Sequence, residues 1–183
     1  MSLLPETLHK RVHKLIKTLQ WALIISAVLA GVELYCPYGL SINPSPSLPM
    51  GLYWDGPAPK TLHAGELACF SYAPPQWAIA RHYYKPGVNF CKWVLGVPGD
   101  TIIKKGRAIS ICHAGQCISA GVVMKTDSEG RPIFAAALPR VIPAGEYYFG
   151  STRVPNSYDS RYLGLIDATT VTRVIHPLFT QSR

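Results

Sequence analysis

The chain has 183 residues, of which 48% are hydrophobic and 15% are charged, and its formal net charge is +8. This composition excludes a wholly disordered chain, and the length allows one membrane segment followed by one compact domain. The positive charge forms no patterned block beyond the N-terminus and accompanies no nucleic-acid-binding motif, so we expect a membrane surface and no nucleic acid as the partner.

An apolar run at residues 19–35 follows a basic segment. The run is slightly shorter than the roughly 20 residues of a typical membrane-spanning helix. Because positive charge favours the cytoplasmic side, we predict a cytoplasmic N-terminus at 1–18, a membrane anchor at 19–35 and an exported domain at 36–183. A signal peptide cleaved near residues 28–30 and a buried core helix are the alternatives. The basic residues before the run are Lys10, Arg11, Lys14 and Lys17.

Residues 37–59 contain six prolines. Proline lacks a backbone N–H group, so we expect a stiff, extended lead-in here and neither a helix nor a central strand. From Tyr35 to Ser47 an extended chain reaches at most about 40 Å. Whatever chemistry Ser47 performs is therefore expected close to the membrane.

The remainder of the chain has the pattern of a mainly β domain. Two apolar runs of strand length, 67–72 and 90–97, predict buried strands. Residues 121–140 include a surface turn at 127–132 and show no chemistry. The 15 glycines and 16 prolines also fit a loop-rich β fold better than a helical bundle. Further strands are predicted at 101–105, in a hairpin around Ala114-Gly115, at 141–142, at 146–149 and at 171–175.

The five cysteines are an odd number for a protein in an oxidising compartment. Cys112 and Cys117 bracket a short turn and fit a small disulfide loop, with free thiols as the alternative. A metal site that adds His113 to this pair lacks a fourth ligand at the usual spacing. No partner can be assigned to the other three, Cys36, Cys69 and Cys91.

Three segments carry the chemistry of the chain: SPSLPMGLY at 45–53, FCKWVLGVPGD at 90–100 and NSYDSRYLG at 156–164. In this order, after a membrane anchor, they resemble signal peptidases that use a Ser-Lys dyad. The sequence SLPMGLYW at 47–54 is most similar to the TraF-like branch of conjugative-transfer peptidases. The resemblance covers the anchor and residues 41–166, and it implies a coiled mixed β-sheet domain on one N-terminal transmembrane helix.

Ser47 and Lys92 form the predicted catalytic dyad. A serine hydroxyl needs a base to become a strong nucleophile, and lysine is a base only when it is neutral. Lys92 lies among apolar residues of a predicted strand, where desolvation would lower its pKa, although lysines in such positions often extend to the surface. Pro46 has no N–H group, so the backbone donor for the oxyanion is expected to come from Ser47 itself.

The resemblance assigns supporting roles to four more residues. It implies that the Ser45 hydroxyl donates to the oxyanion, with an ordinary turn serine as the alternative. It also implies that the Ser157 hydroxyl holds the lysine and that Asp159 supports catalysis. We expect Arg161 to form a structural ion pair with this aspartate.

Two positions depart from the pattern of the family. Trp93 follows the lysine where a basic residue is usual, and Gly150-Ser151-Thr152 replaces Gly-Asp-Asn. Neither change removes a reacting group. No histidine lies in a nucleophile–base motif, and a Cys-His peptidase that uses Cys91 is a remote alternative.

The resemblance implies a serine endopeptidase that uses no metal or organic cofactor and cleaves a membrane-associated protein precursor. For the TraF-like branch this precursor is a pilin subunit, whose own amine can resolve the acyl-enzyme to give a cyclic product. The expected location is the bacterial inner membrane, with one membrane pass and a periplasmic catalytic domain, beside components of a type IV secretion apparatus. A general signal peptidase and a membrane-tethered scaffold without activity are the alternatives.

Overall fold

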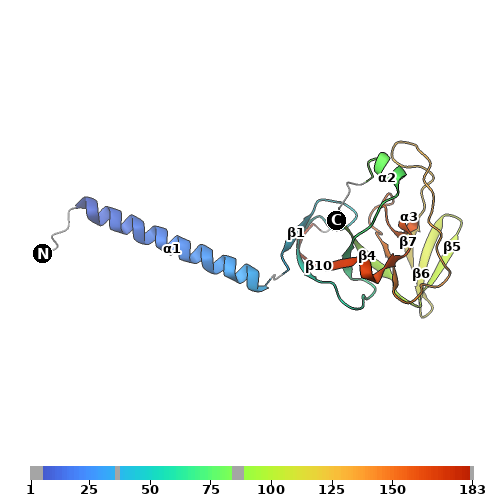
Figure 1. The fold of residues 1–183 in the computed structure, drawn as a ribbon, viewed down its shortest axis with the longest axis horizontal. Helices are drawn as coiled ribbons and strands as arrows, with labels where there is room; N and C mark the ends of the chain where they lie inside the picture. The colour runs from blue at the N-terminus through green and yellow to red at the C-terminus, as the bar shows by residue number, and fades with distance from the viewer. Residues whose placement is uncertain (1–5, 36–37, 84–88, 182–183) are drawn as a thin grey trace. The chain divides into compact units, whose positions relative to one another are not determined.

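The computed structural model describes residues 6–35, 38–83 and 89–181 (Figure 1). The chain divides into two compact units, Met1–Gly39 and Leu40–Arg183. Each unit has its own secondary structure, helical in the first and mainly β in the second. The predicted mainly β fold with one long N-terminal helix is confirmed.

The first unit is built around helix α1 (Glu6–Tyr35). Within it, Leu8–Tyr35 is long and apolar enough to cross a membrane, and none of its most apolar window is buried. The helix begins upstream of the apolar run because the basic segment is also helical. An apolar helix of this length near the N-terminus is consistent with a membrane anchor or a signal sequence.

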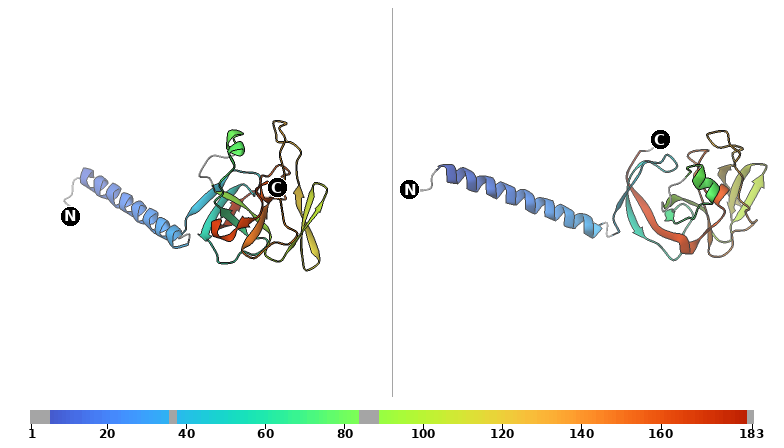
Figure 2. Two further views of the ribbon diagram at one scale, coloured as in Figure 1. Left: turned by 45° about the vertical axis from the view of Figure 1, so that its right-hand side comes forward. Right: turned by 45° about the horizontal axis from the view of Figure 1, so that its top comes forward.

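The second unit contains a seven-stranded sheet and a three-stranded sheet. Figures 1 and 2 show the small sheet at the opposite end of the β domain from β1. In spatial order the large sheet contains β1 (Leu40–Asn43), β2 (Gly51–Pro57), β10 (Val171–Thr180), β3 (Leu67–Phe70), β4 (Phe90–Gly96), β8 (Glu146–Gly150) and β9 (Ile166–Asp167). The small sheet contains β5 (Thr101–Lys105), β6 (Ala108–His113) and β7 (Gln116–Val122).

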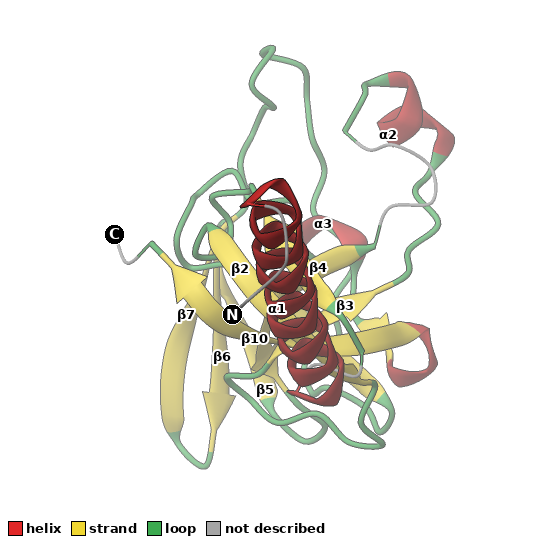
Figure 3. Ribbon diagram, turned by 90° about the vertical axis from the view of Figure 1, so that its left-hand side faces the viewer, coloured by secondary structure: helices red, strands yellow, loops and turns green. Residues whose placement is uncertain are grey.

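Three short helical segments complete the fold, and Figure 3 distinguishes helices from strands by colour. Every strand pair among the described residues is antiparallel, so the parallel pairs that a mixed sheet would contain are absent from this part of the chain. The sequence patterns did not predict the helices, which are α2 (Gln76–Ala80), α3 (Ser160–Leu163) and the 3-10 helix η1 (Ala168–Thr170).

The prediction that residues 37–59 contain no central strand was wrong. Strand β2 lies between β1 and β10 in the large sheet. The strand can form despite the prolines because none lies in its interior. Pro57 is the last residue of the strand, and Pro44, Pro46 and Pro49 lie in the loop before it. The predicted strand at 141–142 is reduced to one isolated bridge, between Val141 and Thr101.

The hydrophobic core lies in three clusters. One packs Phe70, Val94 and Phe149 within the large sheet, and a second packs side chains of both sheets. The third cluster is formed by Leu48, Tyr53, Leu67, Cys69 and Ile175. Because this cluster includes the residue directly after Ser47, it fixes the loop between β1 and β2 on the sheet.

Two disulfides link neighbouring strands. Cys112–Cys117 joins β6 to β7, as predicted from the turn between them. Cys69–Cys91 joins β3 to β4 and was not predicted. These two cysteines are direct partners in the register of the strands. Cys36 lies outside the described residues, and the two disulfides are typical of an exported protein.

Candidate active site

Ser47 lies in the loop between β1 and β2, and its own neighbours hold this loop in place. The Asn43 side-chain amide donates to the backbone oxygens of Ser45 and Pro49, at 2.9 and 3.1 Å. The Tyr53 hydroxyl, from β2, also donates to the oxygen of Pro49, at 2.5 Å. These hydrogen bonds hold the loop that carries Ser47 in one conformation, and the residue is only 5% exposed.

Lys92 lies on β4, and its amine contacts the Ser47 side chain in the loop between β1 and β2. Lys92 Nζ is 2.7 Å from Ser47 Oγ. Lys92 is 7% exposed, so it does not extend to the surface as the alternative proposed. The two residues are far apart in the sequence, and the folding of the sheet brings them into hydrogen-bond contact.

The surroundings of Lys92 favour its neutral form. Burial lowers its pKa from 10.5 to about 8, because desolvation disfavours an ammonium group. The Asp159 carboxylate opposes this shift and the Arg161 guanidinium adds to it, both through their charge. A substantial fraction of the amine is thus unprotonated in weakly alkaline solution and can accept a hydrogen bond from the Ser47 hydroxyl.

Ser45, for which the resemblance implies the role of a second oxyanion donor, lies beside Ser47. Its hydroxyl is 3.1 Å from Ser47 Oγ, and the Ser47 backbone N–H donates to it over 3.4 Å. Ser45 is exposed, so its hydroxyl can rotate toward a bound molecule. Two donors, one from the backbone and one from a side chain, therefore lie next to the same hydroxyl.

Asp159 and Arg161 form a fully buried, two-point ion pair. The guanidinium donates from Nε to Oδ1 at 2.8 Å and from Nη2 to Oδ2 at 2.9 Å. Arg161 also donates to the backbone oxygens of Val122, Pro155 and Ser157. This is the structural pair that was expected. Among the described residues no ion pair joins the aspartate to Lys92, so its influence on that amine is through charge alone.

Ser151 connects this ion pair to Ser47, and the sequence patterns did not assign it a role. Its hydroxyl donates to the backbone oxygen of Ser47 over 2.6 Å. Its backbone N–H donates to Asp159 Oδ2 over 3.2 Å. Ser151 occupies the middle of the Gly-Ser-Thr sequence that replaces Gly-Asp-Asn, and that replacement was the available signal.

Ser157 does not make the hydrogen bond implied by the resemblance. Its hydroxyl is buried and has no hydrogen-bond partner among the described residues. Its backbone oxygen instead accepts from Arg161 over 2.8 Å. In this structure Lys92 is therefore held toward Ser47 without help from the Ser157 hydroxyl.

Ser47 and Lys92 line a groove of about 500 Å³ on the surface of the β domain. Strand β8 pairs with β4 only from Trp93 onward. At Lys92, β4 therefore pairs with β3 on one side and with no described strand on the other. An extended peptide in the groove would lie beside this strand. The groove is lined by residues 41–45, Ser47, Tyr83, 89–92, Arg173 and Ile175.

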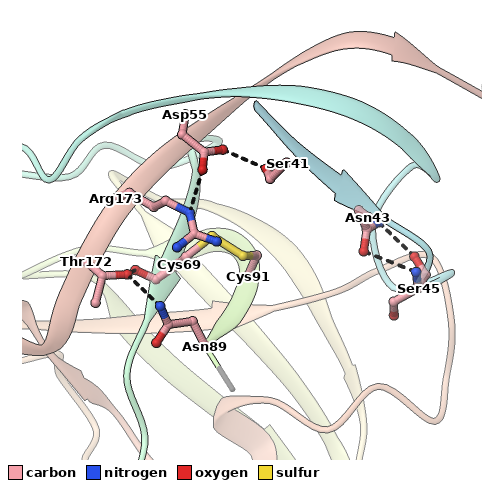
Figure 4. The surroundings of a disulfide bond; sticks show 9 residues. All are labelled: Ser41, Asn43, Ser45, Asp55, Cys69, Asn89, Cys91, Thr172 and Arg173. Atoms are coloured by element: carbon pink, nitrogen blue, oxygen red, sulfur yellow. Dashed lines mark hydrogen bonds and ion pairs between the residues drawn. A yellow bond between two sulfur atoms is a disulfide. The ribbon is translucent and has the colours of Figure 1, made fainter. Parts of the chain in front are cut away.

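The alternative nucleophile and the alternative metal site are both engaged in disulfides. Cys91 is bonded to Cys69, so it offers no thiolate for a Cys-His peptidase (Figure 4). Cys112 and Cys117 are bonded to each other, and the ring of His113 pairs instead with Asp100, at 2.5 Å. In the part of the chain that the structure describes, no cluster of histidine, cysteine and carboxylate ligands has the arrangement of a metal site.

Comparisons with known proteins agree with the motifs and the fold. A sequence model of the family described as signal peptidase, peptidase S26, matches residues 12–177. Plasmid transfer protein TraF of Escherichia coli is 30% identical, over 78% of this chain and 84% of its own length. Conjugal transfer protein TraF of Agrobacterium fabrum is 31% identical, over 78% of this chain and 83% of its own length. The chain therefore belongs to the signal peptidase family, peptidase S26.

Proposed function

We propose that this chain is a membrane-anchored serine endopeptidase in which Ser47 is the nucleophile and Lys92 the general base. The observation that carries the proposal is the 2.7 Å separation of Lys92 Nζ and Ser47 Oγ at a site where burial lowers the lysine pKa to about 8. A neutral amine in hydrogen-bond contact with a hydroxyl is the arrangement that general-base catalysis requires.

The reaction proceeds by acyl transfer. Ser47 Oγ attacks the carbonyl carbon of the scissile peptide bond while Lys92 Nζ takes the hydroxyl proton. The Ser47 N–H group and the Ser45 hydroxyl donate to the oxyanion that forms. The Lys92 ammonium then protonates the leaving amine as the C–N bond breaks, which leaves an ester on Ser47. Lys92 then deprotonates a water molecule that attacks this ester, and the resulting ammonium returns the proton to Ser47 Oγ as the acyl–oxygen bond breaks, which releases the carboxylic acid product and restores the free enzyme.

Asp159 has a supporting role in this proposal. Its charge stabilises the Lys92 ammonium that forms during the reaction, and it opposes part of the desolvation that lowers the lysine pKa. Arg161 holds the carboxylate in place through two hydrogen bonds. The Ser157 hydroxyl is buried and makes no hydrogen bond to the amine among the described residues, so it has no role in this mechanism.

The substrate that we propose is a membrane-associated precursor, namely a pilin subunit in conjugative transfer. Relatives described as plasmid or conjugal transfer proteins support this choice over other exported proteins. In this arrangement residues 1–18 are cytoplasmic, 19–35 are a retained anchor in the inner membrane, and 36–183 act in the periplasm beside the type IV secretion apparatus. Water or the amine of the pilin itself can resolve the acyl-enzyme.

The direct test is the processing of a radiolabelled pilin precursor in membranes that contain the full-length chain. Ser47→Ala and Lys92→Ala are expected to abolish cleavage, whereas Ser128→Ala and Lys105→Ala, at exposed positions outside the groove, serve as matched controls that retain it. Full activity of the Lys92→Ala protein would refute the dyad.

The pH profile tests the base separately. Below the pKa of about 8 the amine is protonated and cannot accept the hydroxyl proton. We therefore expect kcat/KM to rise about tenfold per pH unit up to that point and to level off above it. A profile that is flat from about pH 6 to 10 contradicts a lysine base.

Deletion of the gene distinguishes the pilin substrate from the alternatives. Loss of conjugation alone supports a pilin peptidase, whereas loss of viability with many unprocessed exported proteins supports a general signal peptidase. Pilus assembly that survives in the Ser47→Ala strain would identify the chain as a scaffold.

A further inference from the structure

A partly buried arginine lines the same groove as the dyad. Arg173, on strand β10, contributes to the wall of the groove that contains Ser47 and Lys92. Its side chain is 32% exposed, so the guanidinium is partly removed from water and yet can be reached from the groove. The proposed mechanism gives this residue no role.

Asp55 forms an ion pair with Arg173 that leaves the terminal nitrogens of the guanidinium unused. Asp55 Oδ2 lies 3.1 Å from Arg173 Nε, and Asp55 Oδ1 accepts a hydrogen bond from Ser41 at 2.6 Å. One carboxylate oxygen thus forms an ion pair with the Nε side of the guanidinium, without hydrogen-bond geometry, and the other oxygen is used by Ser41. Among the described residues, nothing pairs with the terminal nitrogens Nη1 and Nη2, which carry no dashed line in Figure 4.

Apart from Asp55, which forms the ion pair with Arg173, the structure places no negative charge beside this guanidinium in the described part of the groove. Besides Lys92 and Arg173, the polar residues along the wall are uncharged, and they include Ser41, Asn43 and Asn89. The Asn89 amide donates to the Thr172 hydroxyl at 3.4 Å, next to Arg173 in the chain. No aspartate or glutamate lines the described part of the groove. An anionic group of a bound molecule would therefore meet two terminal nitrogens with free N–H groups, and no carboxylate among the residues that line the groove.

We propose that Arg173 is a specificity-determining residue that binds a carboxylate of the substrate. The two terminal nitrogens of a guanidinium match the two oxygens of a carboxylate, and such charge-assisted pairs are stronger than neutral hydrogen bonds. The carboxylate is the side chain of an aspartate or glutamate near the cleavage site, or the C-terminal carboxylate of a precursor. This inference rests on the proposed peptidase function and adds a chemical class of substrate to it.

A role limited to the ion pair with Asp55 would not require this geometry. One nitrogen, Nε, supplies that contact, and the remaining donors of a purely structural arginine would be expected to find backbone oxygens, as those of Arg161 do. Arg173 instead leaves its two terminal nitrogens unpaired in a recessed site. A bound carboxylate would restore the hydrogen bonds that these groups lose when the groove excludes water.

Selection of peptides by an inactive protein tests the proposal without requiring cleavage. A displayed library of random dodecapeptides is selected against full-length Ser47→Ala protein in detergent micelles and, in parallel, against the Ser47→Ala/Arg173→Gln protein. We expect the first selection to enrich an acidic residue at one fixed position, or peptides near a free C-terminus, and the second to lose this enrichment. Arg140→Gln, which removes the same charge at an exposed position outside the groove, is the matched control.

Synthetic peptides then distinguish the two sources of the carboxylate. Replacing the enriched glutamate by glutamine, or the free C-terminal acid by an amide, is expected to weaken binding to the Ser47→Ala protein about ten- to hundredfold. Binding to the Ser47→Ala/Arg173→Gln protein is expected to change little with either replacement. Arg173→Lys is expected to keep only part of the preference, because lysine has no planar pair of donors. Thermal unfolding of each variant shows whether the chain remains folded.

The outcomes separate this proposal from the peptidase function on which it rests. The role of Arg173 is refuted if the Ser47→Ala protein selects no acidic residue and no free C-terminus. It is also refuted if the Ser47→Ala/Arg173→Gln protein shows the same preference. Both conclusions hold even when the wild type cleaves the selected peptides. If the preference depends on Arg173 and the wild type cleaves none of those peptides, the groove binds carboxylates but the proposed peptidase function is refuted.

Discussion

Replacement of Lys92 by methionine is expected to stabilise the folded protein while it removes the proposed base. Methionine has a similar length and no charge, so it can occupy the same buried space. The pKa of Lys92 is about 8 in the folded chain and 10.5 for an unperturbed lysine. Between these values the unfolded chain binds more protons, so the stability of the wild type rises with pH in that range.

The magnitude follows from this difference in pKa. At pH 7 the folded state must bury an ammonium group, which costs about 3 kcal/mol relative to a neutral side chain. This cost falls to about 2 kcal/mol at pH 9 and below about 1 kcal/mol at pH 10.5. Loss of the hydrogen bond between Lys92 and Ser47 offsets about 1 kcal/mol of the gain. We therefore expect Lys92→Met to be more stable than the wild type by about 2 kcal/mol at pH 7.

Urea unfolding of the full-length chain in detergent micelles, followed by tryptophan fluorescence at several pH values, measures this effect. Lys105→Met, a substitution at an exposed lysine, is the matched control and is expected to show no pH-dependent difference from the wild type. A Lys92→Met protein that is less stable at neutral pH, or a difference that does not shrink as the pH rises, would refute the desolvation argument.

Three further substitutions test the framework around the dyad by the same unfolding measurement. Asp159→Asn leaves the buried guanidinium of Arg161 without its counter-charge, and we expect a loss of about 3–5 kcal/mol; an unchanged unfolding midpoint contradicts this. Gly121→Ala places a methyl group 2.7 Å from Arg161 Nη1 at a φ of +94°, so it is expected to destabilise more than Gly115→Ala, where φ is +84° and nothing lies within 4 Å; equal effects would show that backbone strain alone matters. Cys69→Ala opens a disulfide that spans 22 residues, and a loss of about 3 kcal/mol is expected, with no loss if the unfolded chain is already constrained.

The sequence predicted the elements of the site better than their connections. The order of the motifs pointed to Ser47 and Lys92 because each lies in a short segment that resembles a signal peptidase motif. The structure places Lys92 Nζ 2.7 Å from Ser47 Oγ. Ser151 was missed as a connecting residue because its role depends on backbone groups of two other segments. A sequence pattern carries no information about which backbone oxygen a hydroxyl will meet.

Two features that the sequence patterns did not reveal depend on strand register. The Cys69–Cys91 disulfide follows from the pairing of β3 with β4, and that register is set by the packing of both strands in the core. The same holds for Arg173, whose place in the groove depends on how β10 lies between β2 and β3. Proline content was a reliable guide to the loop around Ser47 but a poor guide to β2, because only the strand interior excludes proline.

The contacts of Arg161 have a consequence for how the small sheet influences chemistry at a distance. Arg161 binds the backbone of Val122 at the end of β7, Asp159 receives both Arg161 and Ser151, and Ser151 in turn fixes the carbonyl of Ser47. The β5–β7 hairpins are thus connected to the backbone of Ser47, at the edge of the groove, by a series of polar contacts. Under the proposed mechanism, a substitution in these hairpins that displaces Arg161 is therefore expected to change the rate of cleavage more than the binding of peptides.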